Sequence, residues 1–317
     1  MKHIFVINPA AGKGGRPLHL LPQIKALADR LQLAYQLHLT TSSGEAIDFT
    51  RACCQQNQGL DLRFYAVGGD GTLNEVVSGA VGCQNAQIAC LPTGSGNDFI
   101  RNFPQAAFND LTAQINGTAH LTDLIQIDEQ AKDGQVKTYY TVNIAHIGFD
   151  TAVVAKAAEL KTRPLITGSA AYLLSVFYNL INKSGENLRI CADGQILHNG
   201  PLLLAAAANG GFYGGGLPGA PLAAVDDGLL DLCLIKDTSR SKFVSLLPSY
   251  LKGRHLQNKR AQQIIIYRQC RELTITPNNG TALLCRDGET TAVGGLLSVR
   301  LLPKALRFVV PQGKAQK

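Results

Sequence analysis

Three glycines within four positions form the strongest chemical signal in this chain. Gly68, Gly69 and Gly71 follow the apolar run of residues 64–67, and apolar residues recur at helical spacing from Leu73 onward. This pattern predicts a strand, a tight loop and a helix N-terminus, whose unpaired N–H groups and dipole suit a phosphate. The loop has neither the Gly-Lys-Ser/Thr ending of a P-loop nor a G-x-G-x-x-G fingerprint. We therefore expect a nucleotide that is held in a different way.

Two more loops follow predicted strands in the same part of the chain. Residues 8–14 follow a strand at 4–8, and residues 91–99 follow a strand at 88–91. In parallel α/β sheets the ligand lies outside the carboxyl ends of the strands. We therefore expect all three loops to meet at one crevice.

Two Asp-Gly pairs occur much later, at Asp227-Gly228 and at Asp287-Gly288, and Glu289 follows the second pair. Asp-Gly is a favoured sequence for a two-residue hairpin turn. Spacing alone therefore predicts ordinary turns at both places.

Taken together and in order, these motifs resemble the diacylglycerol kinase catalytic-domain family. The resemblance is carried by Gly-Gly-Asp-Gly-Thr at 68–72, Leu-Pro-x-Gly-x-x-Asn-Asp-Phe at 91–99, Asn-Pro-x-x-Gly at 8–12 and Asp-Gly-Glu at 287–289. It covers nearly the whole chain. It implies a lipid kinase, related to sphingosine and ceramide kinases, that phosphorylates a hydroxyl of diacylglycerol or a related lipid. The product would be a phospholipid such as phosphatidic acid.

The resemblance also implies ATP as the phosphate donor and assigns roles to individual residues. Asp287 and Glu289 fall where the family has its catalytic base, and the resemblance does not decide between them. Ala11 stands where the family commonly has Ser, and Ser95 replaces a more usual Thr. The implied nucleotide contacts are Asn8, Thr40, Val67, Gly68, Gly69, Asp70, Gly71, Thr72, Leu73 and Ser95.

Two Mg²⁺ sites are implied in the same way. Near the phosphates, Asp70, Asp98 and Asp123 would organise water and the metal. A second, structural site would use Asp227 with the backbone carbonyls of Ala224 and Leu229. Carboxylate and carbonyl oxygens are the ligands that this hard cation prefers.

Two alternative functions stay open. An NAD kinase shares the Gly-Gly-Asp-Gly motif and a β-rich second half, although residues 97–99 (Asn-Asp-Phe) favour a lipid kinase. A non-catalytic regulator that binds a lipid or a nucleotide would keep the glycine loop but would not need the carboxylates. Phosphorylation of NAD, or nucleotide binding without turnover, would identify these alternatives.

The elements that must position these residues change character along the chain. Residues 1–122 alternate strands and helices, which predicts an α/β nucleotide-binding domain with a parallel sheet. Apolar spacing places Leu20, Ile24, Leu27 and Leu31 on one helix. The predicted elements are strands at 4–8, 35–39, 64–67 and 88–91 and helices at 44–56, 72–81 and 108–116.

Residues 123–305 are rich in short β-type runs separated by turn signals, which predicts a C-terminal antiparallel β-sandwich. The resemblance implies that this is the lipid-substrate domain. A last strand at about 306–311 is expected to return to the first domain. A helix at 168–182 is predicted to line an acyl-chain pocket or to pack in the core, and another is predicted at 242–251. The predicted strands are 124–127, 139–144, 188–192, 202–208, 229–235, 263–267, 272–276 and 296–302.

Composition limits the possible partners and the location. The net charge is +7, and the tightest basic cluster, at 252–260, is either a solvated helix end or a surface for anionic lipid or nucleotide phosphate. No basic stripe interleaved with aromatic residues indicates nucleic acid. The apolar stretch at the start is too short for a signal peptide, and no apolar run is long enough to span a membrane. The eight cysteines lack metal-binding spacing. We expect a cytoplasmic enzyme with reduced, mostly buried thiols that touches the membrane surface transiently; a homodimer is one possible assembly.

Overall fold

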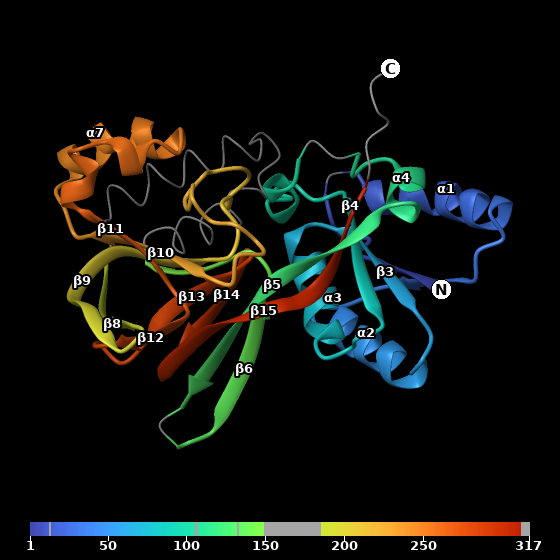
Figure 1. The fold of residues 1–317 in the computed structure, drawn as a ribbon, viewed down its shortest axis with the longest axis horizontal. Helices are drawn as coiled ribbons and strands as arrows, with labels where there is room; N and C mark the ends of the chain where they lie inside the picture. Colours follow the sequence, from blue (N-terminus) through green and yellow to red (C-terminus); the bar gives the residue numbers. More distant parts are fainter. Residues whose placement is uncertain (13, 105–106, 132, 149–184, 312–317) are drawn as a thin grey trace. The chain divides into compact units, whose positions relative to one another are not determined.

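The computed structural model describes residues 1–12, 14–104, 107–131, 133–148 and 185–311, and Figure 1 shows the ribbon. The chain divides into two compact units, Met1–Asp123 with Pro303–Lys317, and Leu124–Leu302. Two strands, β5 (Thr118–Gln130) and β15 (Leu296–Val310), run from one unit into the other. The sequence-based boundary, after residue 122, differs from this division by one residue.

The first unit alternates strands and helices. Its strands β2, β1, β3 and β4 pair in that order and are parallel, and β15 joins β4 in the same direction through Phe308 and Ile88. The expected parallel sheet is therefore confirmed. The elements are β1 (Lys2–Ile7), α1 (Arg16–Arg30), β2 (Tyr35–Leu39), α2 (Glu45–Gln56), β3 (Leu62–Gly68), α3 (Asp70–Ala80), β4 (Ala86–Pro92), η1 (Phe99–Asn102) and α4 (Leu111–Ile115).

Helices cover both faces of this sheet. Phe5, Ile7, Tyr65 and Val67 share a core with α1 and α4, while α2 and α3 lie on the other side of the sheet in Figure 1. Burial on both faces explains why β3 is a continuous apolar run that is buried at all seven positions. The prediction that Leu31 lies on the apolar face of this helix was wrong, because α1 ends at Arg30 and Leu31 is exposed.

The second unit is antiparallel, as predicted. Its strands follow the order β14-β13-β7-β9-β8-β12-β15, with β10 between β9 and β11 and with β5 between β15 and β6. The elements are β6 (Val136–Thr141), β7 (Ile144–Gly148), β8 (Glu186–Ala192), β9 (Gln195–Ala208), β10 (Leu230–Lys236), α7 (Arg240–Leu251), η2 (His255–Gln257), η3 (Ala261–Gln263), β11 (Ile265–Cys270), β12 (Glu272–Pro277), β13 (Ala282–Arg286) and β14 (Glu289–Val293).

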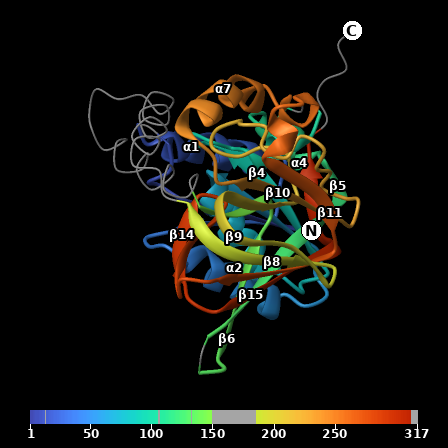
Figure 2. The same ribbon diagram turned by 90° about the vertical axis from the view of Figure 1, so that its left-hand side faces the viewer.

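Strand β9 separates two hydrophobic clusters in this unit. Leu202, Ala205 and Ala207 belong to the cluster that contains Ile125 and Ile147. The alternate positions of β9 belong to a second cluster, into which α7 packs with Leu246 and Tyr250. Figure 2 shows α7 beside β10 and β11. Burial on both faces explains why residues 202–208 read as an unbroken apolar run.

Four predicted strands differ from the structure. The run 139–144 belongs to two strands, β6 and β7. Val142 and Asn143 lie between them and break the strand. The predicted strands at 296–302 and at about 306–311 are parts of one long strand, β15. Residue Gln263 lies in η3, and β11 begins at Ile265.

Other expectations concern helices and cysteines. The helix expected at 168–182, with its acyl-chain role, lies outside the described residues. None of the helices in the described ranges is long and apolar enough to cross a bilayer. All eight cysteines are free thiols, and five of them are buried.

Candidate active site

The loop between β3 and α3 is shaped by close backbone contacts. A Cβ on Gly68 would collide with the side chain of Thr72, and a Cβ on Gly94 would collide with the Cα of Gly69. The N–H groups of Thr93 and Gly94 donate to the carbonyl oxygen of Gly68 at 2.8 and 3.1 Å. The loops that follow β3 and β4 therefore touch through glycine, with no room for a side chain.

The first loop joins the same group. The backbone N–H of Asn8 donates to the carbonyl oxygen of Val67 at 3.0 Å, and its side-chain amide donates to the Thr72 hydroxyl at 3.2 Å. A Cβ on Gly12 would collide with the carbonyl oxygen of Thr93. The three loops meet at the carboxyl edge of the sheet, as the sequence predicted. Thr40 also lies at this edge, where its N–H donates to Ile7 at 2.9 Å.

The predicted nucleotide contacts differ in what they expose. Val67 and Leu73 are buried, and the Leu73 N–H already donates to the Gly69 carbonyl at 3.0 Å. Ahead of Leu73, the N–H groups of the first turn of α3 have no intrahelical acceptor. Gly71 and Ser95 are exposed. A ligand at this edge would therefore meet the main chain of the loop rather than the side chains of Val67 and Leu73.

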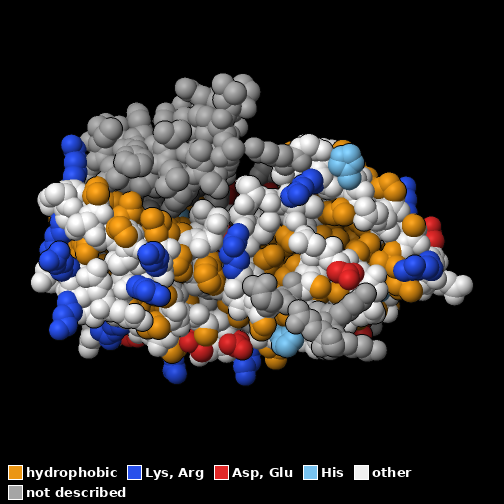
Figure 3. All heavy atoms as spheres, turned by 90° about the horizontal axis from the view of Figure 1, so that it is seen from above, with side chains coloured by type: hydrophobic (Ala, Val, Ile, Leu, Met, Phe, Trp, Pro, Cys, Tyr) orange, Lys and Arg blue, Asp and Glu red, His pale blue; other side chains and the backbone are white. Residues whose placement is uncertain are grey.

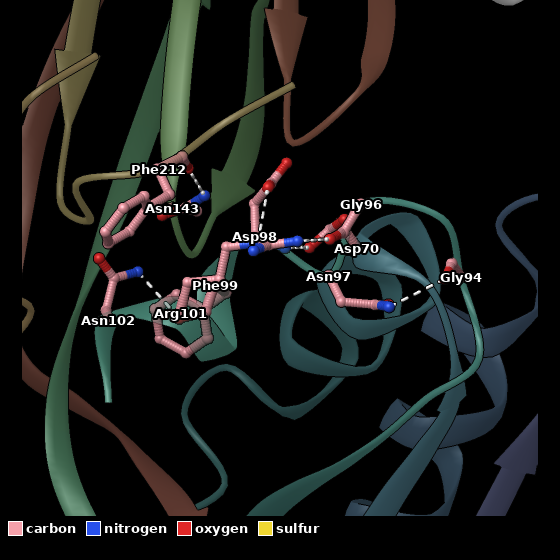
Figure 4. Close-up of polar contacts among 10 residues, drawn as sticks. All are labelled: Asp70, Gly94, Gly96, Asn97, Asp98, Phe99, Arg101, Asn102, Asn143 and Phe212. Atoms are coloured by element: carbon pink, nitrogen blue, oxygen red, sulfur yellow. Dashed lines mark hydrogen bonds and ion pairs between the residues drawn. The ribbon is translucent and has the colours of Figure 1, made fainter. Parts of the chain in front are cut away.

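Two carboxylates stand at these loops. The Asp98 N–H donates to Oδ1 of Asp70 at 2.6 Å, and Oδ1 of Asp98 lies 3.4 Å from Nε of Arg101 (Figure 4). Between them lies Gly96, where a Cβ would be 2.6 Å from Oδ2 of Asp70 and 3.2 Å from Oδ2 of Asp98. Asn97 adopts φ 52° and donates its side-chain amide to the Gly94 carbonyl at 2.9 Å. Gly96 and the left-handed conformation of Asn97 therefore allow the carboxylates of Asp70 and Asp98 to approach the same place beside Gly96.

Asp123 has a different setting. It is buried, and its Oδ1 accepts a hydrogen bond from the N–H of Lys304 at 2.7 Å, which ties β5 to β15. Among the described residues no three His, Cys, Asp or Glu side chains gather closely enough to hold a metal ion. Mg²⁺ commonly takes only one or two carboxylates and completes its shell with phosphate and water. The pair of Asp70 and Asp98 fits that use, and the role of Asp123 stays a prediction.

In the second unit, Asp287 lies in a hairpin turn and also holds a distant loop. Residues Asp287 and Gly288 have φ 45° and 91°, which makes the predicted two-residue turn between β13 and β14. The Asp287 carboxylate accepts four hydrogen bonds from the break between β6 and β7. The donors are the Thr141 hydroxyl at 2.5 Å and the N–H groups of Val142 at 2.9 Å, Asn143 at 3.3 Å and Ile144 at 3.0 Å.

These contacts leave the two oxygens of Asp287 unequal. Three of the donors point at Oδ2, whereas Oδ1 accepts, among the described residues, only the Ile144 N–H. Burial raises the pKa of this carboxyl above its usual value, while the hydrogen bonds act in the opposite direction. The result is a fixed carboxylate with an acceptor site left on Oδ1.

The break that holds Asp287 is itself held by two asparagines. The Asn143 side chain donates to the Phe212 carbonyl at 2.6 Å (Figure 4), and the Asn209 N–H donates to the Asn143 carbonyl at 2.8 Å. The Asn209 side chain also donates to the Val142 carbonyl at 2.8 Å. Sequence reasoning missed Thr141, Asn143 and Asn209. An asparagine within or directly after an apolar run was the available signal. Such a side chain is expected to be buried, and a buried amide needs hydrogen-bond partners.

Glu289 and Asp227 are more open. Glu289 is exposed and lies 3.5 Å from Arg286, whose guanidinium stacks 4.2 Å from the Tyr139 ring centroid. Asp227 is exposed, and its Oδ1 accepts the Leu229 N–H at 3.0 Å within its own loop. A structural Mg²⁺ at Asp227, Ala224 and Leu229 therefore stays a prediction.

The chain thus combines a glycine-lined parallel sheet with an antiparallel β-domain. Residues 2–127 match the family model described as the diacylglycerol kinase catalytic domain. Residues 143–310 match the YegS C-terminal NAD kinase beta sandwich-like domain. The chain belongs to the diacylglycerol kinase catalytic-domain family of lipid kinases, and the family implies ATP as the phosphate donor.

Individual relatives agree with the two family models. The chain is 28% identical to a diacylglycerol kinase of Bacillus subtilis (strain 168), over 99% of this chain and 97% of that protein. It is 30% identical to a "Probable lipid kinase YegS-like" of Pectobacterium atrosepticum, over 72% of both chains.

Solved structures show the same fold. A diacylglycerol kinase structure from Bacillus anthracis str. Sterne has a TM-score of 0.67 at 20% identity and covers 98% of this chain and 96% of its own. The yeast NADH kinase has a TM-score of 0.53 at 12% identity, over 99% of this chain and 84% of its own. Likeness at this level is of fold alone, so it gives the NAD kinase alternative no further support.

Proposed function

We propose that this chain is an ATP-dependent, Mg²⁺-requiring kinase that phosphorylates a hydroxyl of diacylglycerol or a related lipid. The product is a phospholipid such as phosphatidic acid. The observation that carries this proposal is the contact of the Gly68–Gly69 backbone with Gly94, which leaves main-chain N–H groups and two carboxylates at one edge. Family membership supports the lipid as the acceptor.

Each part of the site has a role in this proposal. The N–H groups of the first turn of α3 bind the phosphates, and the loop glycines allow their close approach. Asp70 and Asp98 would hold Mg²⁺, and the ion would neutralise charge on the transferred phosphoryl group. Little covalent chemistry is asked of the protein, because positioning and charge neutralisation supply most of the catalysis.

We assign the base to Asp287 rather than Glu289. Four hydrogen bonds orient the Asp287 carboxylate, and Oδ1 keeps an acceptor site for the proton of the acceptor hydroxyl. Its raised pKa makes it a better base than an ordinary aspartate. Glu289 is exposed and pairs with the Arg286 guanidinium at 3.5 Å, which orients it less firmly than the four hydrogen bonds orient Asp287.

The test is a kinase assay with radiolabelled ATP and a panel of acceptors: diacylglycerol, monoacylglycerol, sphingosine, ceramide and NAD. A labelled phospholipid, lost when EDTA removes Mg²⁺, is the expected result. Asp70→Asn should raise the Mg²⁺ concentration needed for half-maximal rate. Labelled NADP with no labelled lipid would replace the proposal with an NAD kinase, and nucleotide binding without turnover would indicate a regulator.

A further inference from the structure

The basic charge of this chain is concentrated in one segment. Residues 238–264 contain six Lys and Arg side chains and no Asp or Glu, whereas the other 290 residues contain 24 basic and 23 acidic side chains. Almost the entire net charge of +7 therefore comes from this segment. The six are Arg240, Lys242, Lys252, Arg254, Lys259 and Arg260.

The segment folds as α7, η2 and η3, and α7 is apolar on its exposed side as well as on its buried one. Leu246 and Tyr250 pack into the cluster that lines β9 and β10. On the opposite side, Val244, Pro248 and Leu251 are exposed at positions i, i+4 and i+7, which places them in one stripe. Val244 is 51% exposed and Leu251 is 43% exposed.

A loop of the same unit adds to this stripe. Gly253, in the turn after α7, has φ 66°, and a Cβ there would lie 3.1 Å from the side chain of Pro218 and 3.7 Å from Pro221. The neighbouring Leu222 is 63% exposed. We call Val244, Pro248, Leu251, Leu222 and the six basic residues the α7–η3 surface.

Four of the six cations of this surface are available to a partner. Lys252, Arg254, Lys259 and Arg260 are exposed, and within the described ranges none of the four pairs with a carboxylate. Figure 3 shows blue basic side chains around orange hydrophobic ones on its left-hand side. Unpaired cations around exposed apolar side chains match the two parts of a bilayer surface, anionic headgroups and acyl chains.

We propose that the α7–η3 surface docks the protein onto the anionic surface of a lipid bilayer. Val244, Leu251 and Leu222 enter the headgroup region, and the surrounding Lys and Arg side chains bind lipid phosphates. A nucleic acid fits less well, because its phosphate backbone offers nothing to a stripe of aliphatic side chains. This inference rests on the proposed lipid kinase function, because an enzyme whose acceptor is a membrane lipid must bind the membrane to reach it.

The test is flotation of the full chain with vesicles that contain neither diacylglycerol nor ATP, so that its result is independent of catalysis. One set of vesicles is phosphatidylcholine alone, and the other is a roughly equal mixture with phosphatidylglycerol. We expect binding to the mixed vesicles only, and loss of that binding between about 0.1 M and about 1 M salt, where the screening length falls from about 10 Å to about 3 Å.

Three double variants separate this surface from a general charge effect. Lys252→Glu with Arg254→Glu should weaken vesicle binding by about thirtyfold or more. Val244→Ser with Leu251→Ser should weaken it by about tenfold without changing the charge. The matched control, Arg189→Glu with Arg271→Glu, changes two exposed cations of the same unit outside the segment and should bind like the unmodified protein.

Three outcomes would overturn the proposal. One is equal loss of binding in the control and in Lys252→Glu with Arg254→Glu. Another is equal binding to vesicles with and without phosphatidylglycerol. The third is binding to double-stranded DNA through Lys252 and Arg254 with no binding to vesicles. Because every substituted side chain is exposed, thermal unfolding is expected to be unchanged and serves as the folding control.

Discussion

The hydroxyl of Thr141 donates a 2.5 Å hydrogen bond to Oδ2 of Asp287, across 146 positions of sequence. This bond joins the end of β6 to the turn between β13 and β14. Because the bond favours the ionised carboxylate, it opposes the burial that raises the pKa of Asp287. Thr141 is therefore a positioning residue for the proposed base.

Replacing Thr141 with Val should raise the pKa of Asp287 further, because a donor to the ionised form is lost while the side-chain volume is kept. A hydrogen bond to a charged group contributes about 1.5–3 kcal/mol, so its loss should be visible in the pH dependence of the rate. The acid limb of the profile of kcat/KM against pH should move to higher pH. Thr141→Ser should restore it. A uniform loss of rate with an unmoved acid limb would mean that Thr141 has only a structural role.

Asp287→Asn and Glu289→Gln distinguish the two candidate bases. Asp287→Asn should lower kcat by about 10²–10⁴-fold, the usual contribution of a general base. Glu289→Gln should cost much less, because Glu289 is exposed and its nearest ion pair, with Arg286, is 3.5 Å long. Steady-state kinetics on the best lipid of the panel provide the measurement, and circular dichroism verifies that both variants fold. The reverse order of effects would assign the base to Glu289.

The sequence predicted the strand, loop and helix around Gly68–Gly71 but not the setting of Asp287. Gly68, Gly69 and Gly71 lie in one short strand–loop–helix segment, so local spacing was enough to predict its shape. The contact of Asp287 with Thr141 joins distant parts of the chain, and a two-residue Asp-Gly turn looks the same whether or not its carboxylate is used. The break at Val142 and Asn143 was also missed, because apolar residues flank it on both sides.

Two glycines at the proposed nucleotide site should respond differently to alanine. A Cβ on Gly94 would collide with the Cα of Gly69, so Gly94→Ala should push the loops apart and cost about 1–3 kcal/mol of stability. Gly71 has nothing within 4 Å of its Cβ position, so Gly71→Ala should leave the free energy of unfolding within about 0.5 kcal/mol of the original. Both should weaken ATP binding by about tenfold or more, the second only because a bound nucleotide approaches Gly71 closely. Calorimetric titration with ATP and urea unfolding measure the two effects. Unchanged ATP affinity in Gly71→Ala would remove this residue from the nucleotide site.

The buried His146 should make the fold sensitive to acid. Burial lowers the pKa of His146 from 6.5 to about 4, so the unfolded chain binds its proton more readily than the folded chain does. Stability from His146 is therefore complete above about pH 6.5 and falls as the pH drops through the range from 6.5 to 4. At about pH 5 the loss is about 2 kcal/mol relative to neutral pH.

His3 and His255 have pKa values lowered to about 4 in the same way, so the unmodified chain should lose more than this in total. His146→Phe removes the contribution of His146. The free energy of unfolding that the unmodified chain loses on acidification, minus that which the variant loses, is therefore the contribution of His146. Urea unfolding of both proteins at neutral and at acid pH provides the numbers, and equal m-values verify that both expose the same surface. If both proteins lose the same free energy on acidification, His146 is already protonated in the fold or binds protons equally in both states.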